Sequence, residues 1–260
     1  MSKKVVLFII VMLSLVGSVQ AGLCWSAGSG DWATGSNWDV GTKPVAGDQA
    51  LVLWDHTIAI TGQEQVSTLN LGYVANGTLN VAAGGSLTAS TIHVGQTDEG
   101  NLEVGTMNVN GTVTTNTLYV AFERNNGRGV LNVNNGGLVT VNEGFYMSTA
   151  NTTEVDAFAR INLNGNGSII SNWGGVGGIA VQMQSVYAHI DIEGGYMRFN
   201  GDQRGQIQAY INDGRLTGYD GAGTVNADFD GTYTFVTAIP EPATMMLLGL
   251  GGLLLRRKMA

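Results

Sequence analysis

Short triplets of apolar, polar and apolar residues recur along the chain at nearly constant intervals. They begin at Leu79, Met107, Leu131, Ile161 and Ile190, so that successive triplets are 28, 24, 30 and 29 residues apart, and Asn fills the middle position in four of the five. Because successive side chains of a strand point to opposite faces, each triplet turns its apolar residues to one side and its middle residue to the other. The pattern predicts a short strand that returns once per repeat with one buried face.

A turn rich in Gly or Asn follows each triplet and leads to a second alternating segment, such as 86–88 or 138–140, and several repeats add a third, such as 91–95 or 117–120. The chain has 39 glycines and 3 prolines, and glycine accepts the left-handed backbone that tight corners need. Two or three strands in 24 to 30 residues make one coil of a β-solenoid. One coil is too small to be stable alone, whereas stacked coils share a core.

This pattern resembles the right-handed parallel β-helix of autotransporter-like surface proteins. The resemblance implies an all-β fold in which strands of successive coils pair in parallel. An antiparallel sandwich or jelly roll is the alternative fold.

Both ends of a solenoid expose strand edges that something must cover. Four of the five tryptophans, Trp25, Trp32, Trp38 and Trp54, crowd one segment near the N-terminus, and we expect them to form a cap. Exposed Trp rings also suit sugar rings, so a glycan platform at Trp32 and Trp38 is the alternative.

Residues 203–212 carry apolar side chains at helical spacing, with Asp202 before them as an N-cap and Gly214 shortly after them. We expect a short amphipathic helix that covers the last coil. Final strands are expected around 223–227 and 232–236.

The N-terminus has the three parts of a secretory signal peptide. Lys3 and Lys4 precede an apolar stretch over residues 5–16, and small residues lead up to Ala21. We therefore expect cleavage between Ala21 and Gly22.

Cys24 is the only cysteine, so no intramolecular disulfide can form. Leu23 stands before it, where a lipidation signal requires a small side chain. We interpret Cys24 as a buried thiol, with an unpaired reactive thiol or a lipidated residue as the alternatives.

The C-terminus contains a short motif, an apolar run and a basic end. These are, in order, Pro240, Glu241 and Pro242, then residues 243–255, then Arg256, Arg257 and Lys258. The order resembles the PEP-CTERM sorting signal of exported bacterial proteins, which implies an exosortase-type membrane protease as the partner that processes the chain. A helix over residues 243–255 would span about 20 Å, short of the roughly 30 Å hydrocarbon core. We therefore expect a transient transmembrane helix whose basic end stays in the cytoplasm.

These features divide the chain into five segments. They are a signal peptide (1–21), a Trp-rich N-terminal cap (22–57), the β-solenoid coils (58–200), a closing helix with final strands (201–237) and the sorting signal (238–260).

The exported part is strongly acidic. All 20 acidic residues lie between residues 22 and 242, whereas 5 of the 12 basic residues lie outside that range, which gives a net charge of about −13. Such a surface repels phosphate backbones and disfavours nucleic acid as a partner.

The sequence contains no recognisable catalytic or cofactor-binding motif. His56, His93 and His189 lack metal-ligand spacing, and we interpret them as strand or loop histidines. A calcium site among the late acidic residues is the alternative to ordinary polar turns. Those residues are Asp213, Asp220, Asp228 and Asp230.

An enzyme acting on polysaccharide would need carboxylates close together, or Arg and Lys that neutralise an acidic sugar. Glu99 with Glu103, and Asp191 with Glu193, are candidate pairs, but the second pair alternates with apolar residues and has the pattern of outward side chains.

We therefore expect an exported, non-enzymatic protein of the cell surface or extracellular matrix that needs no cofactor and contacts the membrane at least transiently through its C-terminal helix. A carbohydrate-binding module, or a polysaccharide-acting β-helix of the extracellular polymer, is the alternative.

Overall fold

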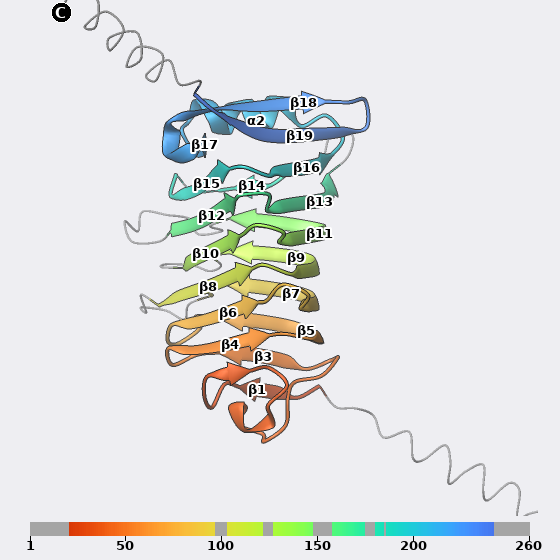
Figure 1. The fold of residues 1–260 in the computed structure, drawn as a ribbon, viewed down its shortest axis with the longest axis vertical. Coiled ribbons are helices and arrows are strands. Elements are labelled where there is room, and N and C mark those ends of the chain that lie inside the picture. Colours follow the sequence, from red (N-terminus) through yellow and green to blue (C-terminus); the bar gives the residue numbers. More distant parts are fainter. Residues whose placement is uncertain are drawn as a thin grey trace, which may run out of the picture.

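The computed structural model describes residues 21–96, 103–121, 127–147, 158–174, 180–184 and 186–241. The chain forms a β-solenoid whose coils stack along one axis from the N-terminal to the C-terminal end (Figure 1). The expected signal peptide lies outside the described residues except for Ala21, and so does the expected membrane helix. In the described part of the chain, no helix is both long and apolar enough to cross a bilayer.

Each coil adds strands to three columns, and strands within a column pair in parallel with the coils before and after them. The first column is β2 (Gly30–Asp31), β4 (His56–Ile60), β6 (Gly77–Val81), β8 (Val104–Val109), β10 (Arg128–Val133), β12 (Phe158–Asn164), β15 (Ala188–Glu193) and β17 (Leu216–Gly218). The second is the first half of β5 (Gln63–Leu71), β7 (Ser86–Val94), β9 (Thr112–Val120) and β11 (Leu138–Met147), then β13 (Ser168–Gly174) and β16 (Tyr196–Asn200). The third is β1 (Leu23–Trp25), β3 (Gln49–Val52), the second halves of the same long strands, and β14 (Gln182–Met183).

The apolar–polar–apolar triplets found in the sequence pair with one another in register on the first column. Met107 pairs with Leu79 on one side and Leu131 on the other, and the ladder continues to Ile161 and Ile190. The predicted parallel β-solenoid is confirmed, and the antiparallel sandwich is wrong for the coils. The right-handed winding stays a prediction.

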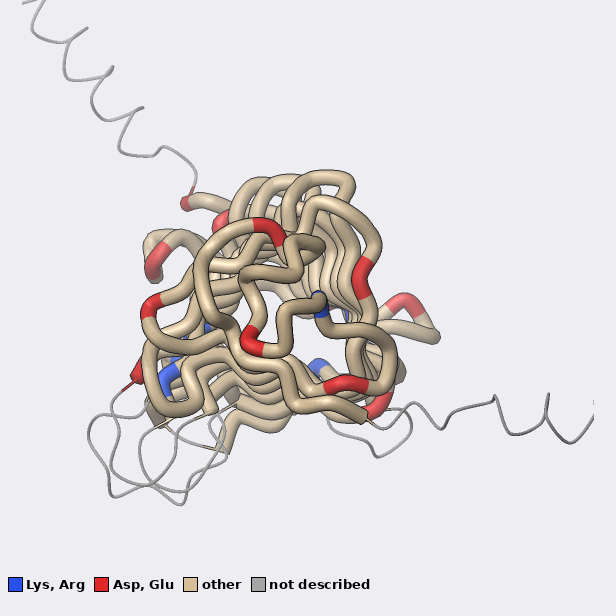
Figure 2. The backbone as a smooth tube through the Cα atoms, turned by 90° about the horizontal axis from the view of Figure 1, so that it is seen from below, with Lys and Arg blue, Asp and Glu red and all other residues tan. Residues whose placement is uncertain are grey.

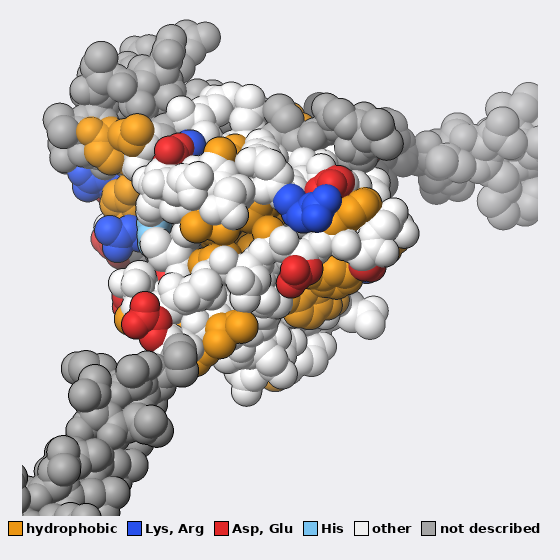
Figure 3. Space-filling view, turned by 90° about the horizontal axis from the view of Figure 1, so that it is seen from above, with side chains coloured by type: hydrophobic (Ala, Val, Ile, Leu, Met, Phe, Trp, Pro, Cys, Tyr) orange, Lys and Arg blue, Asp and Glu red, His pale blue; other side chains and the backbone are white. Residues whose placement is uncertain are grey.

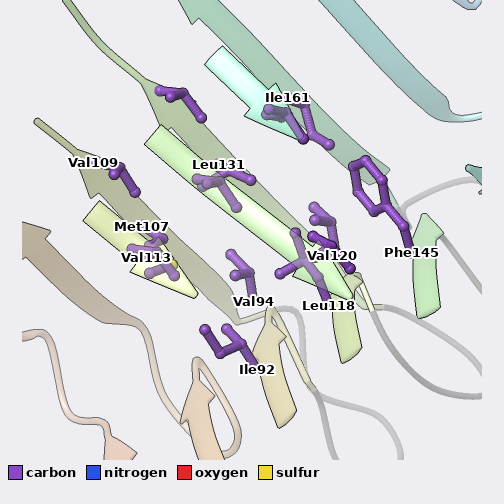
Figure 4. Close-up of a cluster of buried hydrophobic side chains, with 14 of the residues drawn as sticks. Ile92, Val94, Met107, Val109, Val113, Leu118, Val120, Leu131, Phe145 and Ile161 are labelled. Atoms are coloured by element: carbon purple, nitrogen blue, oxygen red, sulfur yellow. The ribbon is translucent and has the colours of Figure 1, made fainter. Parts of the chain in front are cut away.

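The core runs the length of the solenoid. The ladder residues of the first column are at most 1% exposed, and they face apolar residues of the third column such as Ile92 and Leu118. Figure 4 shows Met107, Leu131 and Ile161 opposite these side chains. Since each coil covers the apolar residues of its neighbours, the burial is shared along the axis.

One row of small residues allows the corner between the third and first columns to pack tightly. Gly77, Gly105, Gly129 and Ala159 stack in register on the first column. A Cβ atom at Gly105 would overlap the carbonyl oxygen of Leu71 in the coil before it. The glycines of the sequence therefore serve close backbone approach as well as turns.

The C-terminal end closes with an antiparallel ribbon. β19 (Tyr233–Pro240) pairs antiparallel with both β16 and β18 (Gly223–Phe229), and β17 connects to β18 through the short helix η2 (Tyr219–Gly221). The final strands predicted near 223–227 and 232–236 are confirmed.

The predicted closing helix is α2 (Arg204–Asn212), which ends before Gly214, a residue with a left-handed φ of 70°. The helix starts one residue later than predicted, so Gln203 stands at the cap position, without a side-chain bond there. The Asp202 carboxylate still accepts from the first-turn amide of Arg204 at 3.3 Å, and it pairs with the guanidinium of Arg204 at 2.7 Å.

The side chains of α2 take the place of a further strand above the third column. Tyr210 Oη donates to the carbonyl oxygen of Val181 at 3.0 Å and accepts from the amide of Met183 at 3.4 Å. Gln206 Oε1 accepts from the amide of Ala180 at 2.8 Å. The edge at β14 is thereby satisfied, and hydrophobic side chains lie among polar and charged ones on the surface of this end (Figure 3).

Candidate functional site

The Pro-Glu pair of the sorting motif lies where the chain leaves the closing ribbon. Pro240 is the last residue of β19 and pairs with Gly223, and the amide of Glu241 donates to the carbonyl oxygen of Ala222 at 3.3 Å. Both motif residues are exposed, and Ile239 before them is 54% exposed. The folded domain thus extends to the motif itself. Pro242 and the basic end (Arg256, Arg257 and Lys258) lie outside the described residues.

The predicted signal peptidase site lies at the opposite end of the solenoid. Ala21 is exposed, and the amide of Gly22 donates to Asp48 Oδ1 at 2.8 Å. Asp48 is 7% exposed, and the other oxygen of its carboxylate accepts from the amide of Val45 at 2.9 Å. The first residue of the expected mature chain is therefore held by a buried carboxylate.

Cys24 points into the core and is 3% exposed. Burial, followed by the charges of Asp48 and Asp39, raises the pKa of its thiol. A protonated thiol in the core is a poor nucleophile, which agrees with the interpretation as a buried structural cysteine.

Two of the clustered tryptophans form the floor of the N-terminal cap. Trp32 is 0% and Trp38 2% exposed, their ring centroids are 4.8 Å apart, and Trp38 Nε1 donates to the carbonyl oxygen of Trp32 at 2.9 Å. Because neither ring has a face on the surface, the glycan platform predicted at Trp32 and Trp38 is wrong. Trp32 and Trp38 form a cap because they fill the core at the N-terminal end of the solenoid.

The other two tryptophans lie on the surface. Trp25 is 37% and Trp54 46% exposed, and their ring centroids are 5.8 Å apart at an interplanar angle of 47°. Trp25 lines a groove of about 270 Å³ on the third column, and Trp54 lies beside the groove against the Trp25 ring. The groove is lined by Leu23, Trp25, Gln49, Leu51, Leu53, Asn70, Tyr73, Val74 and Gln96.

Sequence reasoning missed this groove. The alternation over Leu23, Cys24 and Trp25 does indicate that Trp25 faces outward when the cysteine is buried. Trp54 follows β3 in a turn with a left-handed φ of 55°, which no alternation predicts.

A row of aromatic side chains continues along the same column. His93, Tyr119 and Tyr146 occupy equivalent positions in successive coils, with ring centroids 4.9 Å apart at each step. Trp173 follows at 5.0 Å from Tyr146. Burial lowers the pKa of His93 to about 4, so this ring is neutral near pH 7. The histidine expected to be an ordinary strand residue is therefore part of a stack.

The remaining histidines are hydrogen-bonded to neighbouring coils. His56 Nδ1 is 3.0 Å from Ser26 Oγ, and His189 Nε2 is 3.1 Å from Thr217 Oγ1. Burial, opposed in part by Asp191, lowers the pKa of His189.

One acidic group in the described part of the chain has a geometry that could hold a cation. Carboxylate oxygens of Asp191, Glu193 and Asp220 lie within 4.8 Å of one another. Asp191 is 4% exposed because η2 and β17 cover it, and its Oδ1 accepts from Thr217 Oγ1 at 2.6 Å and from the Asp220 amide at 3.0 Å. The outward carboxylate expected from alternation is thus buried by a later segment.

The other late carboxylates do not join this group. Asp213 pairs with Arg215 at 2.6 Å, and Asp230 Oδ1 accepts from two backbone amides within its own turn. The Asp191 group borders a second groove of about 380 Å³. That groove is lined by Phe158, Arg160, Asn162, Val186, Tyr187, His189, Asp191 and Asp220. Of the candidate pair Glu99 and Glu103, Glu99 lies outside the described residues.

Comparison with known proteins identifies the tail. Residues 238–258 match the family model described as the PEP-CTERM protein-sorting motif. No curated protein and no solved structure matches the chain. The chain therefore carries the sorting motif of an exosortase substrate, and the motif begins within β19, two residues before Pro240.

Proposed function

We propose that this protein is a non-enzymatic scaffold of the bacterial cell surface or extracellular matrix, delivered through a signal peptide and an exosortase-type processing step. The observation that carries the proposal is the position of the sorting motif. Pro240 and Glu241 are exposed and follow directly on a sealed solenoid, so a membrane protease could reach them while the domain stays folded.

The rod itself suits a scaffold. Its coils are joined by continuous parallel pairing and a continuous core, and its two ends are covered by a tryptophan cap and by a helix with an antiparallel ribbon. Closed ends prevent strand addition by other chains. Acidic residues are distributed around the outline of the coils and basic residues are few (Figure 2), which favours solubility outside the cell.

The Gly22 contact supports cleavage after Ala21. Cleavage would convert the Gly22 amide into an ammonium group beside the buried carboxylate of Asp48, at the 2.8 Å separation that the amide already has. A charge-assisted hydrogen bond is stronger than a neutral one. The mature N-terminus would then be held more firmly than the precursor.

The motif joins the closing ribbon without a spacer, so the C-terminal end of the solenoid would face the membrane before processing. The apolar run would form the transient membrane helix, with Arg256, Arg257 and Lys258 on the cytoplasmic side. The exosortase-type protease is the partner in this step.

Intact-mass analysis of protein extracted from the cell surface tests the proposal. We expect a chain that starts at Gly22 and has lost everything after the Pro-Glu-Pro region. Glu241→Ala should leave an unprocessed C-terminus, whereas Glu193→Ala, a change at an exposed carboxylate away from the tail, should be processed normally. An intact C-terminus in the surface-extracted wild-type protein would contradict the proposed route.

A further inference from the structure

We propose that the groove beside Trp25 and Trp54 binds a sugar ring of a neutral glycan. The inference concerns the outer surface of the first coils and does not depend on the route of export. It places the ligand on residues other than the buried pair Trp32 and Trp38.

The groove presents aromatic and apolar surface in an otherwise polar neighbourhood. Leu23, Trp25 and Val74 line the groove and are each between 37% and 46% exposed. Trp54, 46% exposed, extends this apolar surface because its ring lies 5.8 Å from that of Trp25. The indole of Trp25 forms an aromatic wall of the groove, and the Trp54 ring packs beside it at an interplanar angle of 47°. Sugar rings pack their apolar C–H faces against aromatic rings of this kind. Single exposed apolar residues are common on protein surfaces, whereas a cluster of them indicates a binding site.

The outward position of Trp54 is held by the backbone. Trp54 and Asp55 both have left-handed φ angles, 55° and 60°, which are unfavourable for residues other than glycine. Asn76 fixes this turn, because its carbonyl oxygen accepts from the Asp55 amide at 2.8 Å and its side-chain amide donates to Asp55 Oδ1 at 2.8 Å. The ring is therefore presented to solvent by a rigid turn.

The floor of the groove offers a polar group that lacks a partner. Asn70 lines the groove and is 3% exposed, and its Oδ1 accepts no hydrogen bond from any residue that the structure describes. A buried acceptor without a donor is costly, and a ligand hydroxyl that reached it would supply the donor. Gln49 and Gln96 add amide groups to the lining.

The volume of the groove and the lack of charged residues in its lining limit the class of ligand that it can bind. The volume of about 270 Å³ lies just below the range of about 300–1,000 Å³ that is usual for small-molecule sites, which suits one ring of a chain rather than a long segment. None of the lining residues is charged. An anionic sugar would lack a cationic partner there, so the neutral ring is the occupant that the lining favours over a uronic acid.

Isothermal titration of the full-length protein, in a detergent without a sugar headgroup, tests the proposal. The probes are cellotetraose, laminaritetraose and mannotetraose, with tetragalacturonate as the anionic comparison. We expect saturable binding of at least one neutral probe and none of tetragalacturonate. Trp25→Ala and Asn70→Ala should each weaken that binding about tenfold or more.

Trp173→Ala is the matched control, because it removes a partly buried indole near the other end of the same aromatic row and should leave the affinity unchanged. Val74→Lys adds a second test if Trp25→Ala fails to fold, since a charge at the exposed groove wall should also abolish binding. The proposal is overturned if no neutral probe binds, or if Trp173→Ala weakens binding as much as Trp25→Ala.

Discussion

Two rows of partly buried, outward-facing side chains run along the solenoid, and they are held together by different forces. On the first column, Asn80, Asn108, Asn132 and Asn162 stack in register, and each amide after Asn80 donates to the one in the coil before it at 2.7–2.8 Å. On the third column, His93, Tyr119 and Tyr146 stack ring on ring at 4.9 Å. The Asn row satisfies its own polar groups, whereas the aromatic row buries a titratable ring.

The places where the two rows end are the places with unusual chemistry. The position after Asn162 is Asp191, the buried carboxylate of the acidic group. In the other direction, the positions before His93 are Asn70, Leu51 and Trp25, which line the groove. The regular rows form the body of the solenoid. The coils in which the rows end carry the acidic group and the groove.

The largest expected difference between the rows is their response to acid. In the folded chain His93 has a pKa of about 4, whereas in the unfolded chain it takes up a proton near pH 6.5. The unfolded state therefore binds more protons between these values, and the free energy of unfolding should fall by about 3 kcal/mol as the pH is lowered from 6.5 to 4.

His93→Phe keeps a ring in the stack and removes the titration, so its pH profile should be shallower over the same window in denaturant titrations. Trp173→Phe, which changes another ring of the row and removes no titratable group, is the control and should keep the wild-type slope. Parallel profiles for the wild type and His93→Phe would show that the aromatic row is not the acid-sensitive element.

The second prediction concerns the Asn row. Asn132 donates to Asn108 and accepts from Asn162, both at 2.7 Å. Asn132→Ala removes two hydrogen bonds and should lower the free energy of unfolding by about 1–3 kcal/mol, with no dependence on pH between 4 and 7. Asn80 takes part in one bond of the row, so Asn80→Ala should cost about half as much. Equal losses at the two positions would mean that the row does not act as a ladder.

The sequence predicted the Asn row but not the aromatic row, for a physical reason. The Asn residues sit inside apolar triplets, so each is identified by its immediate neighbours. His93, Tyr119 and Tyr146 differ in residue type and are 26 and 27 residues apart, while the matching Asn steps are 28 and 24. Only the backbone path around each corner shows that these rings lie on one line.

Contacts between residues distant in the sequence also explain why two predictions at the candidate site were wrong, the exposed tryptophan platform and the outward carboxylate of Asp191. Both Trp32 and Trp54 lie in turn-rich sequence, and burial separates them only once the coil is closed. Asp191 has the alternation of an outward residue, but η2 returns from residues 219–221 to cover it. Strand periodicity predicts which face a side chain occupies, whereas a contact with a distant segment decides whether that face is exposed.

The smallest expected effect is the coupling between two rings of the aromatic row. Tyr119 and Tyr146 stack at 4.9 Å with an interplanar angle of 13°. Replacing each by Leu, singly and together, should give a coupling energy of about 0.5–1.5 kcal/mol in a double-mutant cycle, because an aromatic pair contributes this much beyond the area it buries. Tyr119 with Tyr196, which belongs to the second column, serves as the uncoupled pair and should give a value near zero. If both cycles gave the same coupling, ring stacking would add nothing specific to the row, and its stability would come from burial alone, in contrast to the hydrogen bonds of the Asn row.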